Sequence, residues 1–242
     1  MLMKTFALSA TFLLLTACSK PEPSAPPPTL ADAKSPELVK AAVIQKQIAE
    51  APQGDPAKPL AQYLELSSGK QLQFAQLALS NMPIDYDKVA ERISSEYRST
   101  QDAFKRKDIA AALKTGIDQE IAKVKQSGYY FMDLGDNPVL ESFNFEKKSF
   151  KVKAFESANS FRYFDDLSQI RLGFSNGQAF DALIVNDEAK ARDIEQKLGQ
   201  YNELGLRLYM FLNGVELGEE RVRAQVMKIE LRDRKGTVMV AQ

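Results

Sequence analysis

The hydrophobic periodicity of this chain changes from helical to alternating at Gly128, and this change constrains the fold more than any other feature. Before Gly128 the apolar residues recur at helical spacing, and after it apolar and polar residues alternate as in strands with one buried face. Helices followed by strands along a chain are typical of an α+β fold. We therefore predict an N-terminal helical segment followed by a mainly antiparallel β-sheet with one inserted helix.

The helical part contains four segments with recognisable starts or stops. They are predicted at residues 36–50, 70–80, 85–97 and 108–127. Ser35-Pro36-Glu37 has the residue types of a helix N-terminus, Asp85 and Asp108 are predicted N-caps, and Met82-Pro83 is a stop signal. The apolar residues of the 36–50 helix could cover the body of the protein or a partner.

The sheet-rich part contains four further signals. Tyr129–Met132 is predicted as a strand, and Asn176-Gly177 as a hairpin turn between strands at 170–174 and 180–185. Asn186 or Asp187 opens the one inserted helix, which runs to about residue 200. In the last long strand the apolar residues occupy even-numbered positions up to Val226 and odd-numbered positions from Met227, which predicts a β-bulge there. A turn and a closing strand at 237–240 follow.

The first eighteen residues have the layout of an export signal. Lys4 is followed by an apolar run from Phe6 to Leu15, which is shorter than the roughly 20 residues of a membrane-spanning helix. The single cysteine of the chain, Cys18, follows at the end of Leu15-Thr16-Ala17. Bulky Leu15 is unsuited to an ordinary secretory cleavage after Ala17, but plain secretion and a retained signal anchor stay open as alternatives.

Leu15-Thr16-Ala17-Cys18 resembles the lipobox of bacterial lipoproteins. The resemblance implies cleavage before Cys18, diacylglycerol on its thiol, and acylation of the new N-terminus. Two or more acyl chains hold a protein stably in a membrane. The resemblance also implies that Ser19, which is not Asp, favours the outer membrane, with the protein facing the periplasm.

The composition after Cys18 predicts a linker and then a compact body. Most of the eleven prolines precede Leu60 and lie among Ser, Ala and charged residues. We expect a signal peptide at 1–17, the lipidated cysteine with a proline-rich linker at 18–59, and one α+β body at 60–242. Within the body, residues 60–127 are predicted helical and 128–242 sheet-rich.

The residues that this chain lacks limit its chemistry. It has no histidine, and lipid on Cys18 leaves no free thiol, which excludes Ser-His-Asp catalysis, zinc sites with His or Cys ligands, and disulfides. The formal net charge is zero, so a general nucleic-acid binder is not expected. No calcium loop or phosphate-binding glycine loop is recognisable, and we predict no catalytic, cofactor-binding or metal-binding residues and no cofactor.

Three groups of side chains were weighed as candidate sites. The carboxylate pairs are Asp165-Asp166, Asp133 with Asp136, and Glu219-Glu220. We interpret them as solvated loop acids, and Lys105-Arg106-Lys107 as a solvated approach to the helix predicted from Asp108. The third group is aromatic: Tyr129, Tyr130, Phe131, Phe143, Phe145, Phe161, Tyr163 and Phe164. We interpret it as core, with stacking on a sugar or base as the alternative.

Four short segments of the body resemble a family of exported bacterial proteins described only as a domain of unknown function. They are Asp102–Asp108, Tyr129-Tyr130, Phe145–Lys148 and Arg162–Phe164. The resemblance covers residues 60–242 and implies one structural unit, with no activity and no site residues.

From these patterns we expect an envelope lipoprotein, bound to the membrane through Cys18, whose body binds a protein or an envelope component without catalysis. Two other functions are left open. One is a carboxylate-dependent hydrolase of cell-wall glycan or peptide, which requires two acids converging in a cleft. The other is an accessory lipoprotein of a secretion or surface-assembly system.

Overall fold

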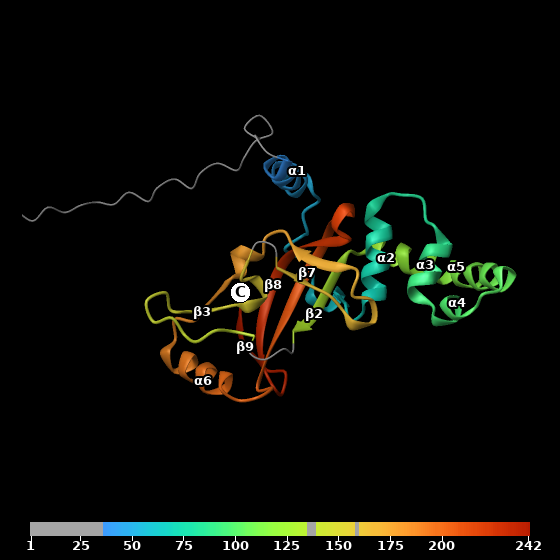
Figure 1. Cartoon of the computed structure of the whole chain (residues 1–242). Coiled ribbons are helices and arrows are strands. Elements are labelled where there is room, and N and C mark those ends of the chain that lie inside the picture. Colours follow the sequence, from blue (N-terminus) through green and yellow to red (C-terminus); the bar gives the residue numbers. More distant parts are fainter. Residues whose placement is uncertain (1–35, 135–138, 158–159) are drawn as a thin grey trace, which may run out of the picture. The chain divides into compact units, whose positions relative to one another are not determined.

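The structure is a computed structural model that describes residues 36–134, 139–157 and 160–242 (Figure 1). The chain divides into two compact units, Met1–Ala49 and Glu50–Gln242, which are described separately. In the first unit, helix α1 (Pro36–Glu50) has the predicted bounds. The lipobox residues, the linker before residue 36 and the predicted cap Ser35 lie outside the described residues.

The second unit is built from five helices and nine strands within its described part. The helices are α2 (Gly69–Ser80), α3 (Tyr86–Ile93), α4 (Ser95–Ser99), α5 (Ala103–Gln126) and α6 (Glu188–Leu198). The strands are β1 (Leu64–Glu65), β2 (Tyr129–Leu134), β3 (Ser149–Lys151), β4 (Phe161–Arg162), β5 (Arg171–Phe174), β6 (Ala182–Ile184), β7 (Leu204–Glu216), β8 (Arg221–Asp233) and β9 (Val238–Ala241). Across the described ranges, none of the helices has both the length and the apolar character needed to cross a bilayer.

Seven strands form the main sheet, in the order β1-β2-β7-β8-β5-β4, with β9 paired to the second half of β8. The β1–β2 and β5–β8 contacts are parallel and the others are antiparallel. Strands β3 and β6 form a separate antiparallel pair. The predicted α+β fold, with a mainly antiparallel sheet and the inserted helix α6, is confirmed.

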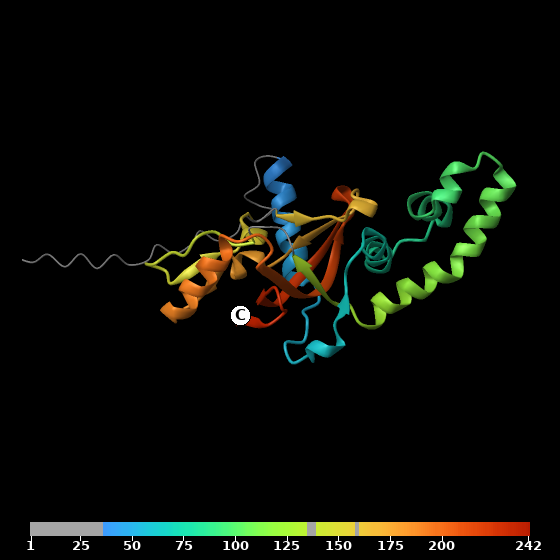
Figure 2. The same cartoon turned by 90° about the horizontal axis from the view of Figure 1, so that it is seen from below.

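The main core packs on one face of this sheet and includes residues of α2, α5, α6 and the β3–β6 pair. Alternate residues of β7 (Leu206, Leu208, Met210 and Leu212) are buried, and α2 packs on β7 and β8. Helices α3, α4 and α5 extend away from the sheet, on the side opposite to α6 (Figure 2). The long helix α5 contacts α2 and α3 and is buried through Ile117, Ile121 and Val124.

The predicted bulge in the last long strand is confirmed. In the β7–β8 ladder Tyr209 pairs with Lys228 but Met210 pairs with Val226, so Met227 is the extra residue. Val226 and Ile229 are both buried despite their opposite parity. The bulge thus lets one strand bury apolar residues of both parities on the same face.

The predicted Asn-Gly hairpin is wrong. The chain forms a short 3₁₀ helix at Gly177–Phe180, and the following β6 pairs with β3, while β5 pairs with β4 and β8. Asn176 is held by β8: its Nδ2 donates to the Val226 carbonyl oxygen at 2.9 Å, and its Oδ1 accepts from the Val226 amide at 2.7 Å. These two bonds keep Asn176 out of the two-residue turn that the sequence suggested.

The helix predicted from Asp85 to Tyr97 is interrupted. Asp85 is its N-cap as predicted, but Ser94 is in an extended conformation, at φ −114° and ψ 116°, and ends α3 after Ile93. The Ser94 hydroxyl then accepts from the Tyr97 amide and caps α4. A serine side chain that bonds to the backbone favours this break over a continuous helix.

Helix α5 begins six residues earlier than predicted. Asp102, rather than Asp108, is its N-cap, and accepts hydrogen bonds from the amides of Phe104 and Lys105. Arg106 Nε also donates to the Thr100 carbonyl oxygen at 2.8 Å, and its guanidinium lies over the Tyr97 ring. The Lys105-Arg106-Lys107 cluster is therefore in the first turns of the helix and does not precede it.

Residues 51–63 lie against the main sheet, on the face opposite to α2. The Gly54 amide donates to Gln225 Oε1 at 2.8 Å, and the Asp55 amide donates to the Tyr129 hydroxyl at 2.6 Å. The Tyr63 ring meets the rings of Tyr129 and Tyr209 edge-on, each at 5.3 Å between centroids. The second unit therefore includes residues ahead of Leu60, where the sequence placed the start of the body.

Candidate functional site

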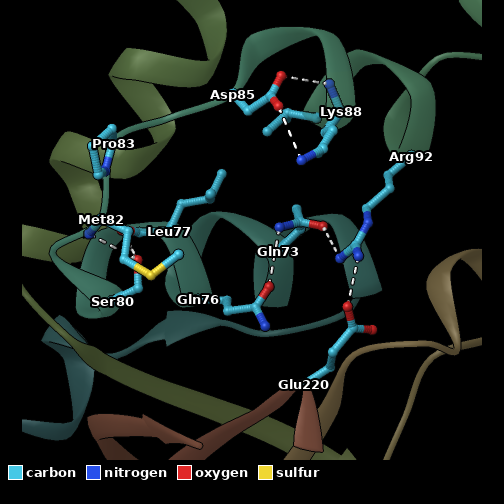
Figure 3. A pocket seen from close by; sticks show the side chains of 11 residues that line it. Gln73, Gln76, Leu77, Ser80, Met82, Pro83, Asp85, Lys88, Arg92 and Glu220 are labelled. Carbon is cyan, nitrogen blue, oxygen red and sulfur yellow. Dashed lines mark hydrogen bonds and ion pairs between the residues drawn. The ribbon is translucent and has the colours of Figure 1, made fainter. Parts of the chain in front are cut away.

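A cavity of about 350 Å³ lies between α2, α3 and the connection from β7 to β8 (Figure 3). It is lined by Gln73, Gln76, Leu77, Ser80, Met82, Pro83, Asp85, Lys88, Val89, Arg92 and Glu220. Its volume is at the lower end of the range of roughly 300–1,000 Å³ that is typical of ligand pockets. We therefore take it as the candidate functional site.

Helix α2 supplies four lining residues from one face. Gln73, Gln76, Leu77 and Ser80 have the spacing i, i+3, i+4 and i+7, which places them side by side along a helix. The helix starts with a capping box between Ser68 and Gln71 and ends at Asn81, which is in the left-handed conformation.

The N-terminus of α2 is also held from a distant part of the chain. The Asp166 carboxylate accepts hydrogen bonds from the amides of Gly69 and Lys70, at 2.7 and 3.3 Å. A carboxylate at this end of a helix satisfies free amides and complements the helix dipole. Asp166 therefore helps to fix the helix that forms the floor of the cavity.

Helix α3 forms the opposite wall. Its N-cap Asp85 and the residues Lys88, Val89 and Arg92 again follow the spacing of one helix face. The Asp85 carboxylate lies 3.3 Å from Lys88 Nζ, and the backbone amide of Lys88 is the main cause of a lowered pKa of Asp85. This end of the cavity thus carries a fixed, exposed pair of opposite charges.

A chain of hydrogen bonds crosses the other end of the cavity. Arg92 Nη2 donates to Glu220 Oε1 at 2.6 Å, and Arg92 Nη1 donates to Gln73 Oε1 at 3.2 Å. Gln73 Nε2 then donates to Gln76 Oε1 at 3.2 Å (Figure 3). Both glutamines are buried, so the bonds to Arg92 and to each other replace bonds to water.

Glu220 reaches this chain through an unusual backbone conformation. It has φ +47°, in the left-handed region that residues with a side chain rarely adopt, directly before β8. Its carbonyl oxygen accepts from the Arg171 amide at 3.0 Å, which fixes the backbone against β5. The strained residue is therefore held on both sides, by β5 through its backbone and by Arg92 through its carboxylate.

The remaining wall of the cavity is apolar. It consists of Leu77, Met82, Pro83 and Val89, of which Met82 and Pro83 are exposed and Val89 is buried. An apolar wall that faces paired charges and amide groups can hold a ligand with an apolar centre and polar ends. In addition, both acids of the cavity, Asp85 and Glu220, are paired with cations, whereas a general acid requires surroundings that favour its protonated form.

The carboxylate pairs predicted as loop acids have separate partners. Asp166 caps α2, and Asp133 forms a bidentate pair with Arg207 at 2.7 and 2.6 Å, while Asp136 lies outside the described residues. Glu219 binds Arg221 at 3.1 Å, and Glu220 binds Arg92. Asp133 and Asp166 are exposed, as predicted for solvated acids, and Glu219 and Glu220 are half-buried, but each of the four also has a defined partner.

The aromatic residues divide between core and surface. Tyr130 is buried, and Tyr129, Phe131, Phe143 and Phe164 are half-buried. Phe145, Phe161 and Tyr163 are exposed. Tyr130, Phe143 and Phe164 belong to the core or pack on it, as predicted, whereas Tyr129 and Phe131 contact other aromatic rings outside it and the last three residues are exposed.

Sequence reasoning missed the residues that define the cavity. Gln73 and Gln76 are at helical spacing, which the sequence shows. The bond from Arg92 to Gln73, however, joins residues 19 positions apart, and the bond from Arg92 to Glu220 joins residues 128 positions apart. The one available signal was that Gln73 and Gln76 are the polar residues among the otherwise small or apolar buried residues of α2. In the parts of the chain that the structure describes, no three acidic, cysteine or histidine side chains gather into a metal site.

Comparison with models of protein families, with curated proteins and with solved structures found no match to this chain. The lipobox and the similarity of residues 60–242 to an exported bacterial family therefore stay predictions from the sequence.

Proposed function

We propose that this protein is a bacterial envelope lipoprotein whose body is a binding module, with the cavity between α2 and α3 as its ligand site. The ligand is an amphipathic molecule with groups of both charges, such as a segment of peptide. The proposed location is the outer membrane, facing the periplasm, with the chain held by lipid on Cys18. The proposal includes no cofactor and no nucleic-acid partner.

One observation carries the binding proposal, namely the hydrogen-bonded chain Glu220–Arg92–Gln73–Gln76, whose two glutamines are buried, beside an apolar wall. Side-chain amides can bond both the N–H and the C=O of a peptide group, and buried polar groups with fixed partners are pre-organised to do so. The Arg92–Glu220 and Lys88–Asp85 pairs offer charges of both signs to the ends of the ligand.

The same pairing argues against the hydrolase alternative at this cavity. Two carboxylates line the cavity at opposite ends, and each is paired with a cation, Asp85 with Lys88 at 3.3 Å and Glu220 with Arg92 at 2.6 Å. Hydrolysis of a glycan requires one acid that remains protonated. We therefore favour binding over turnover.

The binding proposal is tested with di- and tripeptides that have free termini, added to the isotopically labelled protein and followed by NMR. We expect chemical-shift changes at residues of α2 and α3 and at Glu220. Gln76→Leu should bind the peptides at least tenfold more weakly, because it removes one hydrogen-bonding group that contributes about 1.5 kcal/mol to binding. Gln119→Leu is the matched control, since Gln119 is exposed on α5. Equal binding by both variants, or shifts away from the cavity, would contradict the proposal.

The anchor is tested separately with Cys18→Ala in the native host. We expect wild-type protein in the detergent phase and the variant in the aqueous phase, because without a thiol no diacylglycerol can be attached. Membrane association that does not change in the variant would refute lipid attachment at Cys18, whatever the outcome of the peptide experiment.

A further inference from the structure

A second, smaller cavity of about 230 Å³ lies on the other side of the second unit, between α6 and the segment that leads to β3. It is lined by Ser142, Phe143, Phe145, Glu188, Ala191, Arg192 and Glu195. None of these residues lines the cavity between α2 and α3. The two cavities are therefore independent candidates for binding.

Phe145 is the prominent feature of this cavity, because 79% of its side chain is exposed. Its ring meets Phe143 edge-on at 5.2 Å, and Phe143 packs at 5.0 Å on Phe150, which is fully buried. The exposed ring is thus the outer member of a stack of three that is rooted in the core. An exposed phenylalanine ring forgoes the free energy of its burial, so a ring fixed in this position calls for an explanation.

The turn that carries Phe145 is held in place. Asn144 and Ser149 exchange two backbone hydrogen bonds at 2.9 and 3.3 Å, and the Lys147 amide donates to Asn144 Oδ1 at 2.8 Å. These bonds fix the residues on either side of Phe145. The ring is therefore presented by an ordered turn.

Helix α6 supplies the polar side of the cavity. Glu188, Ala191, Arg192 and Glu195 follow the spacing i, i+3, i+4 and i+7 of one helix face. Glu195 Oε2 accepts from the Phe143 amide at 2.9 Å, which aims this carboxylate across the cavity. Arg192 Nη2 binds Glu188 Oε1 at 2.6 Å and leaves the other guanidinium donors for a ligand.

We propose that this cavity binds one ring of a neutral glycan. The C–H face of a sugar ring packs on an exposed aromatic ring, and its neighbouring hydroxyls can donate to Glu195 and Glu188 and accept from Arg192. The space is smaller than that of a drug-sized pocket and suits a single ring. Two glutamates against one arginine give the rim a charge of −1, which disfavours acidic sugars.

An apolar side chain of another protein is the competing occupant, and the rim argues against it. Closing an apolar group over Glu188, Arg192 and Glu195 would remove water from these charges without offering new hydrogen bonds. A sugar replaces that water with hydroxyl groups.

The test uses the full chain with Cys18→Ala, which is free of lipid, and saturation-transfer NMR. The probes are tetramers of N-acetylglucosamine and of glucose, with an oligomer of galacturonic acid as the acidic probe. We expect saturation of the ring protons of the neutral sugars and weak, millimolar binding. Phe145→Ala should weaken that binding about tenfold, as removal of a stacking aromatic ring does.

Tyr201→Ala is the matched control, because Tyr201 is 81% exposed but does not line the cavity. Phe145→Trp should retain binding, and unchanged melting temperatures would show that the variants fold. The proposal is overturned if neither neutral oligomer binds, if only the acidic oligomer binds, or if Phe145→Ala binds as well as Tyr201→Ala. None of these results depends on the peptide cavity or on the lipid anchor.

Discussion

Two glycines in helices show how strongly the effect of one methyl group depends on its neighbours. A Cβ at Gly69 would lie 2.6 Å from Leu167 Cβ and 2.8 Å from the Leu167 carbonyl oxygen, while a Cβ at Gly116 would meet nothing within 4 Å. The first position is where Asp166 binds the start of α2. The glycine there allows the close approach of the segment that carries Asp166.

We predict that Gly69→Ala destabilises the protein by about 1–3 kcal/mol, because backbone must shift to admit the methyl group. Gly116→Ala should instead stabilise it by about 1 kcal/mol through helix propensity. Urea denaturation of the two variants measures both effects. Equal free energies of unfolding for the two variants would show that the contact with Leu167 is not tight.

Tyr63 gives the protein a specific sensitivity to alkali. Burial, with smaller contributions from Tyr129, Asp55 and Tyr209, raises the pKa of Tyr63 to about 12. A raised pKa favours the neutral phenol of the folded state, so the associated stability is complete below the unfolded pKa of about 10 and is lost as the pH rises toward 12.

We therefore predict that Tyr63→Phe unfolds less readily than wild type above pH 10, by up to about 2–3 kcal/mol near pH 12. Denaturation at several pH values measures the difference. Tyr201→Phe, at an exposed position, should follow the wild-type curve. A parallel fall of all three curves would mean that Tyr63 is not the titrating group.

At the scale of elements, α3 and α5 are joined by a three-residue clamp. The Tyr86 hydroxyl donates to Asp118 Oδ1 at 2.6 Å, and Lys114 Nζ lies 2.6 Å from that hydroxyl and 3.0 Å from Asp118 Oδ2. The hydrogen bond from Tyr86, followed by that from Lys114, lowers the pKa of Asp118. A lowered pKa means that the stabilisation is present above the unfolded pKa and is lost as the pH falls through the folded one.

We expect Tyr86→Phe to raise the pKa of Asp118 toward its ordinary value, because the carboxylate loses its strongest donor. Titration of the carboxyl carbon by NMR measures this shift. Tyr97→Phe is the control, since the Tyr97 hydroxyl donates to Asp87 and not to Asp118. A pKa of Asp118 that is the same in both variants would exclude the clamp.

The sequence predicted those elements whose signals are local. Asp85 caps its helix as predicted, Asp187 is the cap of the two residues predicted for α6, and the change of parity at Val226-Met227 is sufficient to place the bulge. For α5, where two aspartates could be the cap, the prediction chose the wrong one. Asp102 and Asp108 are both possible caps of α5, and the contacts of Arg106 with Thr100 and Tyr97 decide between them.

The candidate site was harder to predict because its contacts are not local. Nothing near Arg92 in the sequence indicates that Glu220 lies beside it, since the pairing depends on how the β7–β8 connection meets α3. The exposure of Phe145 was equally hard to predict, because other aromatic residues of the same region, such as Tyr130, are buried. The composition therefore limited the kinds of chemistry that could be expected, while only the fold shows which residues line the two cavities.

At the scale of the molecule, the segment ahead of Leu60 belongs to the folded unit. A Cβ at Gly54 would lie 2.7 Å from Met227 Sδ and 2.8 Å from Phe211 Cβ, so the backbone of this segment covers apolar side chains of β7 and β8. Its amides also bind Gln225 and Tyr129.

We predict that a chain starting at residue 50 has the same free energy of unfolding as the full chain. In a chain starting at residue 60 the free energy of unfolding should fall by about 2–4 kcal/mol, because two hydrogen bonds are lost and apolar surface becomes exposed. Thermal and urea denaturation of the two truncated chains test this expectation. Equal stability of both would show that residues 50–59 add nothing to the fold.

The side chain of Asn176 has a further consequence for the chemical ageing of the protein. Deamidation at an Asn-Gly pair begins when the Gly177 nitrogen attacks the side-chain carbonyl carbon of Asn176, forming a succinimide and releasing ammonia. In the folded chain both ends of that side chain are bonded to Val226, which holds the amide along β8. Once the amide has become a carboxylate, it can no longer donate to the Val226 carbonyl oxygen. Unfolding that lasts long enough for the succinimide to form and be opened by water would thus leave a permanent carboxylate at position 176 and hinder the return of β8 to its native pairing.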